Sequence, residues 1–175
     1  TRYGRSRGLG DVYKRQVEHP VTEMVTGIDL VKEQILVANG EKLTIKQEDI
    51  KLKGSSIECR INAEHPESFI PSPGKITQYH QPGGLGIRVD SAVYDGYSIP
   101  SHYDSMIGKL ITYGATRSEA LKKMNRALEE YVIMGINTNI QLHQKIIKTD
   151  EFKRGSYNIN FMSVSYTHLT LPTMS

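Results

Sequence analysis

Hydrophobic side chains recur every three or four positions in the second half of the chain, and this spacing predicts an amphipathic helix over residues 118–131. Its apolar face is formed by Leu121, Met124, Leu128 and Tyr131. Thr116 stands three residues before Glu119, which is typical of a capping box at a helix start. A second helix is expected over residues 138–148, with Ile140 and Ile147 turned inward and His143 on its solvated side.

Short alternating segments precede these helices. Residues 56–62, 74–79, 86–91 and 106–113 are rich in strand-forming side chains, and turn sequences containing proline or glycine separate them. Regular turn signals between such segments favour an antiparallel sheet or a small barrel. The chain is therefore expected to be an α+β protein with helices packed on this sheet or barrel-like unit.

A different unit is expected before residue 51. Ile28, Val31 and Ile35 recur at helical spacing, and Thr26 followed by Asp29 is a plausible amino-terminal cap. Residues 42–53 are polar and are expected to connect this helical part to the sheet. We divide the chain into residues 17–50 and residues 51–162, and we set the two ends apart for the reason that follows.

The two ends of the chain resemble translated sequencing adapter. Residues 5–16 (RSRGLGDVYKRQ) and residues 164–173 (VSYTHLTLPT) resemble the two strands of one transposon end, so residues 1–16 and 163–175 are excluded from fold reasoning. Without the first segment, five of the 22 basic and one of the 19 acidic residues are lost, which leaves 17 and 18 and a net charge of −1 instead of +3. No nucleic-acid or membrane partner is therefore inferred from the basic pI.

The interior is expected to be a soluble, cytoplasmic protein. It has no secretory signal and no apolar run near the ~18 residues that a membrane span needs. Its single cysteine, Cys59, suits a reducing compartment and is expected to be a buried small hydrophobe. The interior histidines lack metal-ligand spacing, so no metal site is expected.

Three charged residues are candidates for function. Glu18 is followed by His19-Pro20, where a strand is expected to end, and it could be either functional or a solvated strand-end carboxylate. Arg60 lies in an alternating strand, where it could simply reach water or pair with Glu58 two residues away. Arg88 has the same two explanations, with a protein interface as its functional alternative.

Five sequence motifs resemble successive motifs of bacterial biotin carboxylase and occur in the same order. They are residues 17–24 (VEHPVTEM), 58–64 (ECRINAE), 71–76 (PSPGKI), 103–110 (YDSMIGKL) and 135–139 (GINTN). The resemblance covers nearly all of residues 17–162. It implies the last strand and helices of an ATP-grasp domain over residues 17–50, followed by the biotin carboxylase C-terminal domain over residues 51–162.

The same resemblance implies roles for individual residues. Glu18 resembles the general base that deprotonates bicarbonate, and Arg60 resembles the arginine that binds bicarbonate and later the ureido oxygen of biotin. Val17 resembles a residue whose backbone contacts bicarbonate, and Ile159 resembles an apolar residue against the adenine of ATP. Leu85 and Arg88 lie where the family forms its homodimer.

The resemblance also implies what the chain lacks. The magnesium-binding glutamates and most of the ATP-binding residues of the family lie upstream of residue 17, where this chain has no matching sequence. ATP, Mg²⁺ and biotin are thus expected cofactors of a parent protein, and the fragment itself is expected to be inactive. Gln16 is left out of the site because the adapter itself would encode it.

The parent protein is expected to be the biotin carboxylase of bacterial acetyl-CoA carboxylase, which acts in fatty acid biosynthesis. Its expected partners are the biotin carboxyl carrier protein, the carboxyltransferase subunits and a second copy of itself. One alternative is the corresponding segment of a pyruvate or propionyl-CoA carboxylase. The alternative from another class is a non-catalytic binding or dimerisation module.

Overall fold

The computed structural model describes residues 18–158 and 160–162. The chain divides into two compact units, Thr1–Lys51 and Leu52–Ser175. Val17, Ile159 and the two segments expected to be adapter lie outside the described residues, so the predictions made for them stay predictions.

The described part of the first unit is helical. It contains α2 (Pro20–Thr26), α3 (Leu30–Ala38) and the short 3-10 helix η1 (Gln47–Asp49). The predicted helix is confirmed as α3, with Asp29 as its cap, because the Asp29 side chain accepts a hydrogen bond of 2.9 Å from the Lys32 amide. Thr26 instead ends α2. Val31 and Ile35 on α3 are largely exposed.

The second unit is built on an antiparallel sheet. Within the described residues, β1 (Ser55–Asn62), β6 (Met106–Gly114) and β4 (Ile87–Ser91) form a three-stranded sheet in that order. Two short pairs accompany it, β2 (Gly74–Lys75) with β5 (Ser98–Ile99) and β3 (Gln78–His80) with β7 (Val132–Met134). The expected α+β class and antiparallel pairing are confirmed. The segment predicted over residues 74–79 is two strands, and β5 and β7 were not predicted.

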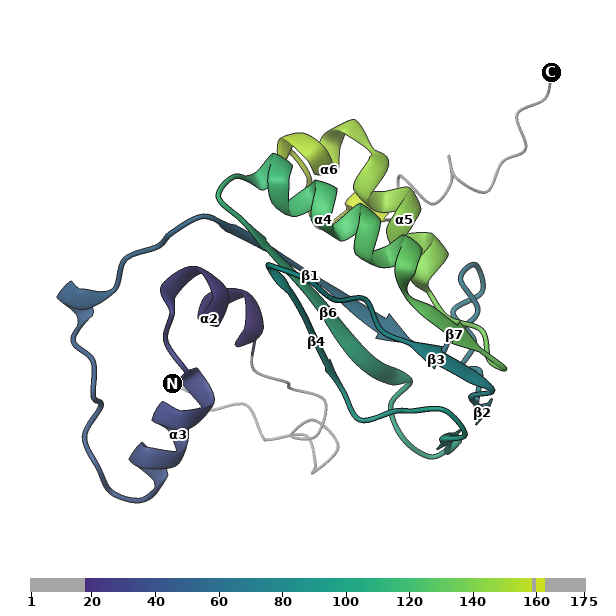
Figure 1. Cartoon of the computed structure of the whole chain (residues 1–175), viewed down its shortest axis with the longest axis horizontal. Coiled ribbons are helices and arrows are strands. Elements are labelled where there is room, and N and C mark those ends of the chain that lie inside the picture. Colours follow the sequence, from purple (N-terminus) through teal and green to yellow (C-terminus); the bar gives the residue numbers. More distant parts are fainter. Residues whose placement is uncertain (1–17, 159, 163–175) are drawn as a thin grey trace, which may run out of the picture. The chain divides into compact units, whose positions relative to one another are not determined.

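Helices α4 (Arg117–Glu130) and α5 (Ile140–Lys148) pack on this sheet, and α6 (Asp150–Arg154) packs against these two helices. Figure 1 shows the three helices together on one side of β1, β6 and β4. The core between the two layers is tight, since Ile61, Leu110 and Met124 have no exposed surface and Leu128 is only 1% exposed. The described residues contain no helix long and apolar enough to cross a membrane.

The capping box of α4 is confirmed, except that the Glu119 carboxylate binds the amide of Ala115 instead of that of the N-cap residue, Thr116. The Thr116 hydroxyl accepts a hydrogen bond of 3.2 Å from the Glu119 amide, and Glu119 accepts one of 2.9 Å from the amide of Ala115. These bonds use backbone donors that a helix start leaves unpaired. The helix therefore begins where the sequence predicts, directly after β6.

Candidate functional site

The sheet of the second unit has one apolar face and one charged face. Along β1, Ile57, Cys59 and Ile61 are buried in the core beneath the helices. Successive side chains of a strand point to opposite faces, so Glu58 and Arg60 lie on the face away from this core. This alternation is what places an arginine on the face of the sheet away from the helices.

The strand register extends this face across all three strands. Arg60 lies opposite Lys109 of β6, which lies opposite Asp90 of β4, and the next row holds Glu58, Ile111 and Arg88. We call these six residues the charged face: Glu58, Arg60, Arg88, Asp90, Lys109 and Ile111. Ile111 has no exposed surface and yet does not belong to the main core cluster, which is consistent with its position among long charged side chains.

Arg60 is oriented by Glu58. Its Nε donates a hydrogen bond of 3.2 Å to Glu58 Oε1, which confirms the pairing that the sequence raised as an alternative to function. The Arg60 side chain is 51% exposed, whereas that of Glu58 is only 11% exposed. The bond to Glu58 uses Nε, and among the described residues the two terminal nitrogens of the guanidinium make no hydrogen bond. An arginine held in this way can present its planar fork to an oxyanion.

Arg88 is held differently from Arg60. It forms two parallel hydrogen bonds of 2.8 Å to the carboxylate of Asp90, so its fork is already engaged within its own strand. Both side chains are about one third exposed. Leu85, in the turn before β4, is 92% exposed. A large exposed apolar side chain next to a paired arginine fits a protein interface better than an anion site.

Glu18 lies in the first unit, immediately before α2, and the structure does not place it in a strand. Its carboxylate accepts hydrogen bonds from the amides of Val21 and Thr22 at 3.0 and 3.3 Å and from the Thr22 hydroxyl at 2.6 Å. Partial desolvation acts to raise the pKa of Glu18, but these hydrogen bonds and the nearby His19 outweigh it and lower the pKa. The carboxylate is therefore ionised at neutral pH and fixed at the start of α2.

The sequence missed two residues that contact Arg60, and one prediction was wrong. His143 was expected on the solvated side of its helix, but it is only partly exposed and its Nε2 donates a hydrogen bond of 2.8 Å to the Arg60 carbonyl oxygen. Burial lowers the pKa of His143, although this hydrogen bond partly opposes the shift. Asn139 donates to the same oxygen through Nδ2 at 3.0 Å. The wrong assignment arose because helical spacing separates apolar from polar positions but does not reveal a buried acceptor.

Cys59 and the described acidic and histidine side chains do not form a metal centre. Cys59 is 4% exposed, and burial raises the pKa of its thiol to about 12. The thiol is thus protonated and enclosed, as the sequence predicts for a buried small hydrophobe. No group of three or more His, Cys, Asp or Glu side chains within residues 18–158 and 160–162 is arranged to hold a metal ion.

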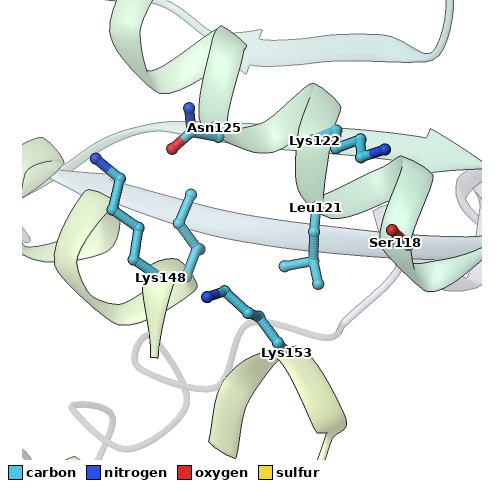
Figure 2. A pocket seen from close by; sticks show the side chains of 7 residues that line it. Ser118, Leu121, Lys122, Asn125, Lys148 and Lys153 are labelled. Carbon is cyan, nitrogen blue, oxygen red and sulfur yellow. The ribbon is translucent and has the colours of Figure 1, made fainter. Parts of the chain in front are cut away.

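A cavity of about 460 Å³ lies on the helical side of the second unit (Figure 2). Side chains of α4, α5 and α6 form it: Ser118, Leu121, Lys122, Asn125, Ile147, Lys148 and Lys153. In Figure 2 the Lys148 and Lys153 ammonium groups come from different helices. Because these helices cover the sheet face opposite Arg60, the cavity and the charged face do not form one site.

Comparisons with known proteins match both units. Residues 58–164 match the family described as the biotin carboxylase C-terminal domain, and residues 12–46 match the ATP-binding domain of the carbamoyl-phosphate synthase L chain. The chain is 59% identical over 147 residues to a biotin carboxylase of Haemophilus influenzae. It is 56% identical over 148 residues to one of the subunits of pyruvate carboxylase from Methanothermobacter thermautotrophicus.

These alignments cover 84% of this chain, and the chain spans about a third of each relative, 33% and 30%. Among solved structures, the chain resembles the biotin carboxylase domain dimer of Hydrogenobacter thermophilus 2-oxoglutarate carboxylase, solved with MgADP and bicarbonate. The TM-score is 0.84 and the identity 47%, over 91% of this chain and 35% of that one. The predicted fold is thereby confirmed, whereas the roles of the individual site residues stay predictions.

Proposed function

We propose, because the chain belongs to the biotin carboxylase family, that its full-length protein is an ATP-dependent ligase that carboxylates carrier-bound biotin with bicarbonate. The observation that best supports this is Arg60, whose guanidinium is hydrogen-bonded to Glu58 through Nε and whose side chain is half exposed on the face of the sheet away from the helices. A relative with the same fold has been solved with bicarbonate and MgADP. Since the chain spans about a third of its relatives, the other catalytic groups would come from the rest of the protein.

The proposed reaction has two steps. An oxygen of bicarbonate attacks the γ-phosphorus of ATP and displaces ADP, which yields a mixed carboxyl-phosphate anhydride. The activated carboxyl group then passes to a ureido nitrogen of biotin as its C–O bond to phosphate breaks, and the proton lost from that nitrogen leaves with the released phosphate. Catalysis of this kind depends on orientation and on cations that offset the developing negative charge.

Glu18 is the proposed general base. Its carboxylate is ionised at neutral pH, as a base must be, and its bonds to α2 fix its orientation. A carboxylate with a lowered pKa is a weak base, so it can deprotonate bicarbonate efficiently only if neighbouring cations also acidify the bicarbonate proton. We assign this supporting part to cations of the full-length protein.

Arg60 is the proposed ligand of bicarbonate and later of the biotin ureido oxygen. When biotin loses a proton, negative charge develops on that oxygen, and a guanidinium stabilises it without itself being able to lose a proton. The exposure of half of the Arg60 side chain leaves room for both ligands in turn. A lysine at this position would lack the planar, two-pronged geometry.

The remaining assignments rest on the resemblance. The backbone of Val17 is proposed to contact bicarbonate, and Ile159 is proposed to pack against adenine. The proposed homodimer interface includes Leu85, which is 92% exposed, and Arg88. Mg²⁺ would accompany ATP, and its ligands would lie in the rest of the protein.

We further propose that the protein is the biotin carboxylase of acetyl-CoA carboxylase, with the carrier protein and the carboxyltransferase as partners in fatty acid biosynthesis. The family includes enzymes with other final acceptors, such as the pyruvate carboxylase and the 2-oxoglutarate carboxylase already described. Assays of the full-length protein with its carrier protein and its co-purified carboxyltransferase, with each acceptor in turn, would distinguish them. Carboxylation of acetyl-CoA alone would support this assignment, and carboxylation of pyruvate would contradict it.

Replacing Glu18 by Gln in the full-length protein tests the proposed base. Gln keeps an acceptor oxygen for the Val21 amide but cannot take a proton, so kcat should fall about 10²–10⁴-fold while the KM for ATP changes little. The matched control is Glu48→Gln, since Glu48 is 76% exposed and pairs only with a surface lysine among the described residues. An unchanged kcat in Glu18→Gln would show that another group is the base.

The chain alone tests the non-catalytic alternative. If this polypeptide is only a binding or dimerisation module when separated from the rest of the protein, its bicarbonate-dependent hydrolysis of ATP should be undetectable. The full-length protein, assayed beside it, should release phosphate. Turnover by the chain alone would mean that it holds a complete site, contrary to the proposal.

A further inference from the structure

Arg60 lies on an edge of the sheet. β1 pairs with β6, and within the described residues no other strand borders its second edge. An exposed edge leaves backbone donors and acceptors without partners. At Arg60 and Asn62 these groups are instead taken up by the chain that leads into α5.

Asn139 replaces a missing strand at this edge. Its backbone amide donates to the Asn62 carbonyl at 3.2 Å, and its Oδ1 accepts from the Asn62 amide at 2.9 Å. Its Nδ2 donates to the Arg60 carbonyl at 3.0 Å. The side-chain amide thus offers the same donor and acceptor that a neighbouring peptide group would offer. Asn139 is only 7% exposed, so these bonds are shielded from water.

Because of this arrangement, the start of α5 lacks a side-chain cap. Asn139 is the N-cap residue of α5, and asparagine at that position usually accepts a hydrogen bond from the first turn, worth about 1 kcal/mol. Here its side chain makes no capping bond. The side chain that would stabilise the helix start is therefore used to fix the backbone of β1 at Arg60.

His143 completes the arrangement one helical turn later. Residues four apart lie on the same side of a helix, so Asn139 and His143 face β1 together. The His143 Nε2 lies 2.8 Å from the Arg60 carbonyl oxygen. A carbonyl can only accept, so this nitrogen carries the proton, and the oxygen has a donor for each of its two lone pairs.

We propose that Asn139 and His143 are positioning residues for Arg60, holding its backbone so that the guanidinium meets bicarbonate and biotin in a fixed orientation. The two ends of the Arg60 residue are then restrained independently, its carbonyl by α5 and its Nε by Glu58. This inference rests on the proposed function of Arg60. It adds residues that do not touch the ligands themselves and act through the arginine.

The test uses His143→Leu and His143→Gln in the full-length enzyme. Leu removes the donor, whereas the Gln amide nitrogen can reach a similar position and donate. Because a misplacement of about 1 Å can cost about 10²-fold in rate, we expect His143→Leu to lower kcat/KM for bicarbonate by about tenfold or more. The KM for ATP should stay within twofold, and His143→Gln should restore most of the activity.

Three controls separate positioning from general damage. Gln141→Leu introduces a leucine, as His143→Leu does, but at an exposed position of α5, and this variant should behave as the wild type. Thermal unfolding establishes that each variant is folded. Should His143→Leu fail to fold, His143→Met supplies a donor-free side chain that adapts to irregular space.

The outcomes distinguish this inference from the function on which it rests. If Arg60→Ala impairs bicarbonate use but the donor-free His143 variant does not, the positioning role is wrong and the role of Arg60 stands. Equal losses in His143→Leu and His143→Gln, or equal losses for ATP and bicarbonate, would also overturn it. If Arg60→Ala leaves bicarbonate kinetics unchanged, the proposed function of Arg60 fails first. In an Arg60→Ala background, His143→Leu should add little further loss.

Discussion

Gly135→Ala should destabilise the second unit more than any ordinary surface substitution. Gly135 follows β7 and has φ +94, a conformation that residues with a Cβ rarely adopt. A Cβ at this position would lie well inside van der Waals contact of the Lys75 carbonyl oxygen and 3.0 Å from the Thr77 nitrogen. Both are backbone atoms, one at the end of β2 and one just before β3, so neither can turn aside as a side chain can.

The expected cost follows from three contributions. The left-handed conformation costs about 1–2 kcal/mol for a non-glycine residue. Overpacking against backbone adds about 1–3 kcal/mol. Moving β7 away would weaken the 2.9 Å hydrogen bond from the Thr77 amide to the Met134 carbonyl, worth about 0.5–1.5 kcal/mol. The sum is about 2.5–6.5 kcal/mol, a large part of the ~5–15 kcal/mol that stabilises a typical domain.

Two other glycines separate these contributions. Gly96 has φ +85, but the nearest atom to an added Cβ is Lys75 Cε at 3.9 Å, so Gly96→Ala should cost only the conformational part, about 1–2 kcal/mol. Gly83 has open space around it and no positive φ, so Gly83→Ala should change stability by about 0.5 kcal/mol or less. The assay is urea unfolding of the chain, followed by far-UV circular dichroism. A cost for Gly135→Ala no greater than that for Gly96→Ala would refute the predicted backbone contact.

Two further predictions concern titration. Because burial raises the pKa of Cys59 to about 12, a thiol reagent should leave the folded chain unmodified near pH 8 and label it fully in denaturant; stoichiometric labelling of the folded chain would contradict the burial of Cys59. Burial lowers the pKa of His143 below its ordinary 6.5, so the unfolded chain binds more protons and the free energy of unfolding should fall as the pH drops below 6.5. Urea unfolding between pH 7.5 and 5 should show a weaker pH dependence for His143→Gln, and an unchanged dependence would assign the effect to other groups.

Several features of the fold are readable in the sequence because the signal and the structure are both local. The capping box of Thr116 and Glu119 fixes the start of α4 within four residues, and the alternation of β1 separates Arg60 from the buried Cys59. The pairs β2–β5 and β3–β7 are different. Each strand is two or three residues long, and Tyr79 pairs with Ile133 from a distant part of the chain. No periodicity can develop over so few residues, so such strands follow from tertiary packing alone.

The candidate site shows the same limit at the level of single side chains. The sequence identifies Arg60 as a charged residue on a strand, and its spacing raises the bond to Glu58 as one alternative, which the structure contains. It does not reveal that the Arg60 carbonyl lies on an open edge, because that depends on which strands become neighbours. Once β1 is at the edge, the Arg60 carbonyl has no partner strand, and the side chains that donate to it come from whichever segment packs there. Asn139 and His143 occupy that place, so their polarity is explained by the position of β1 rather than by exposure to water.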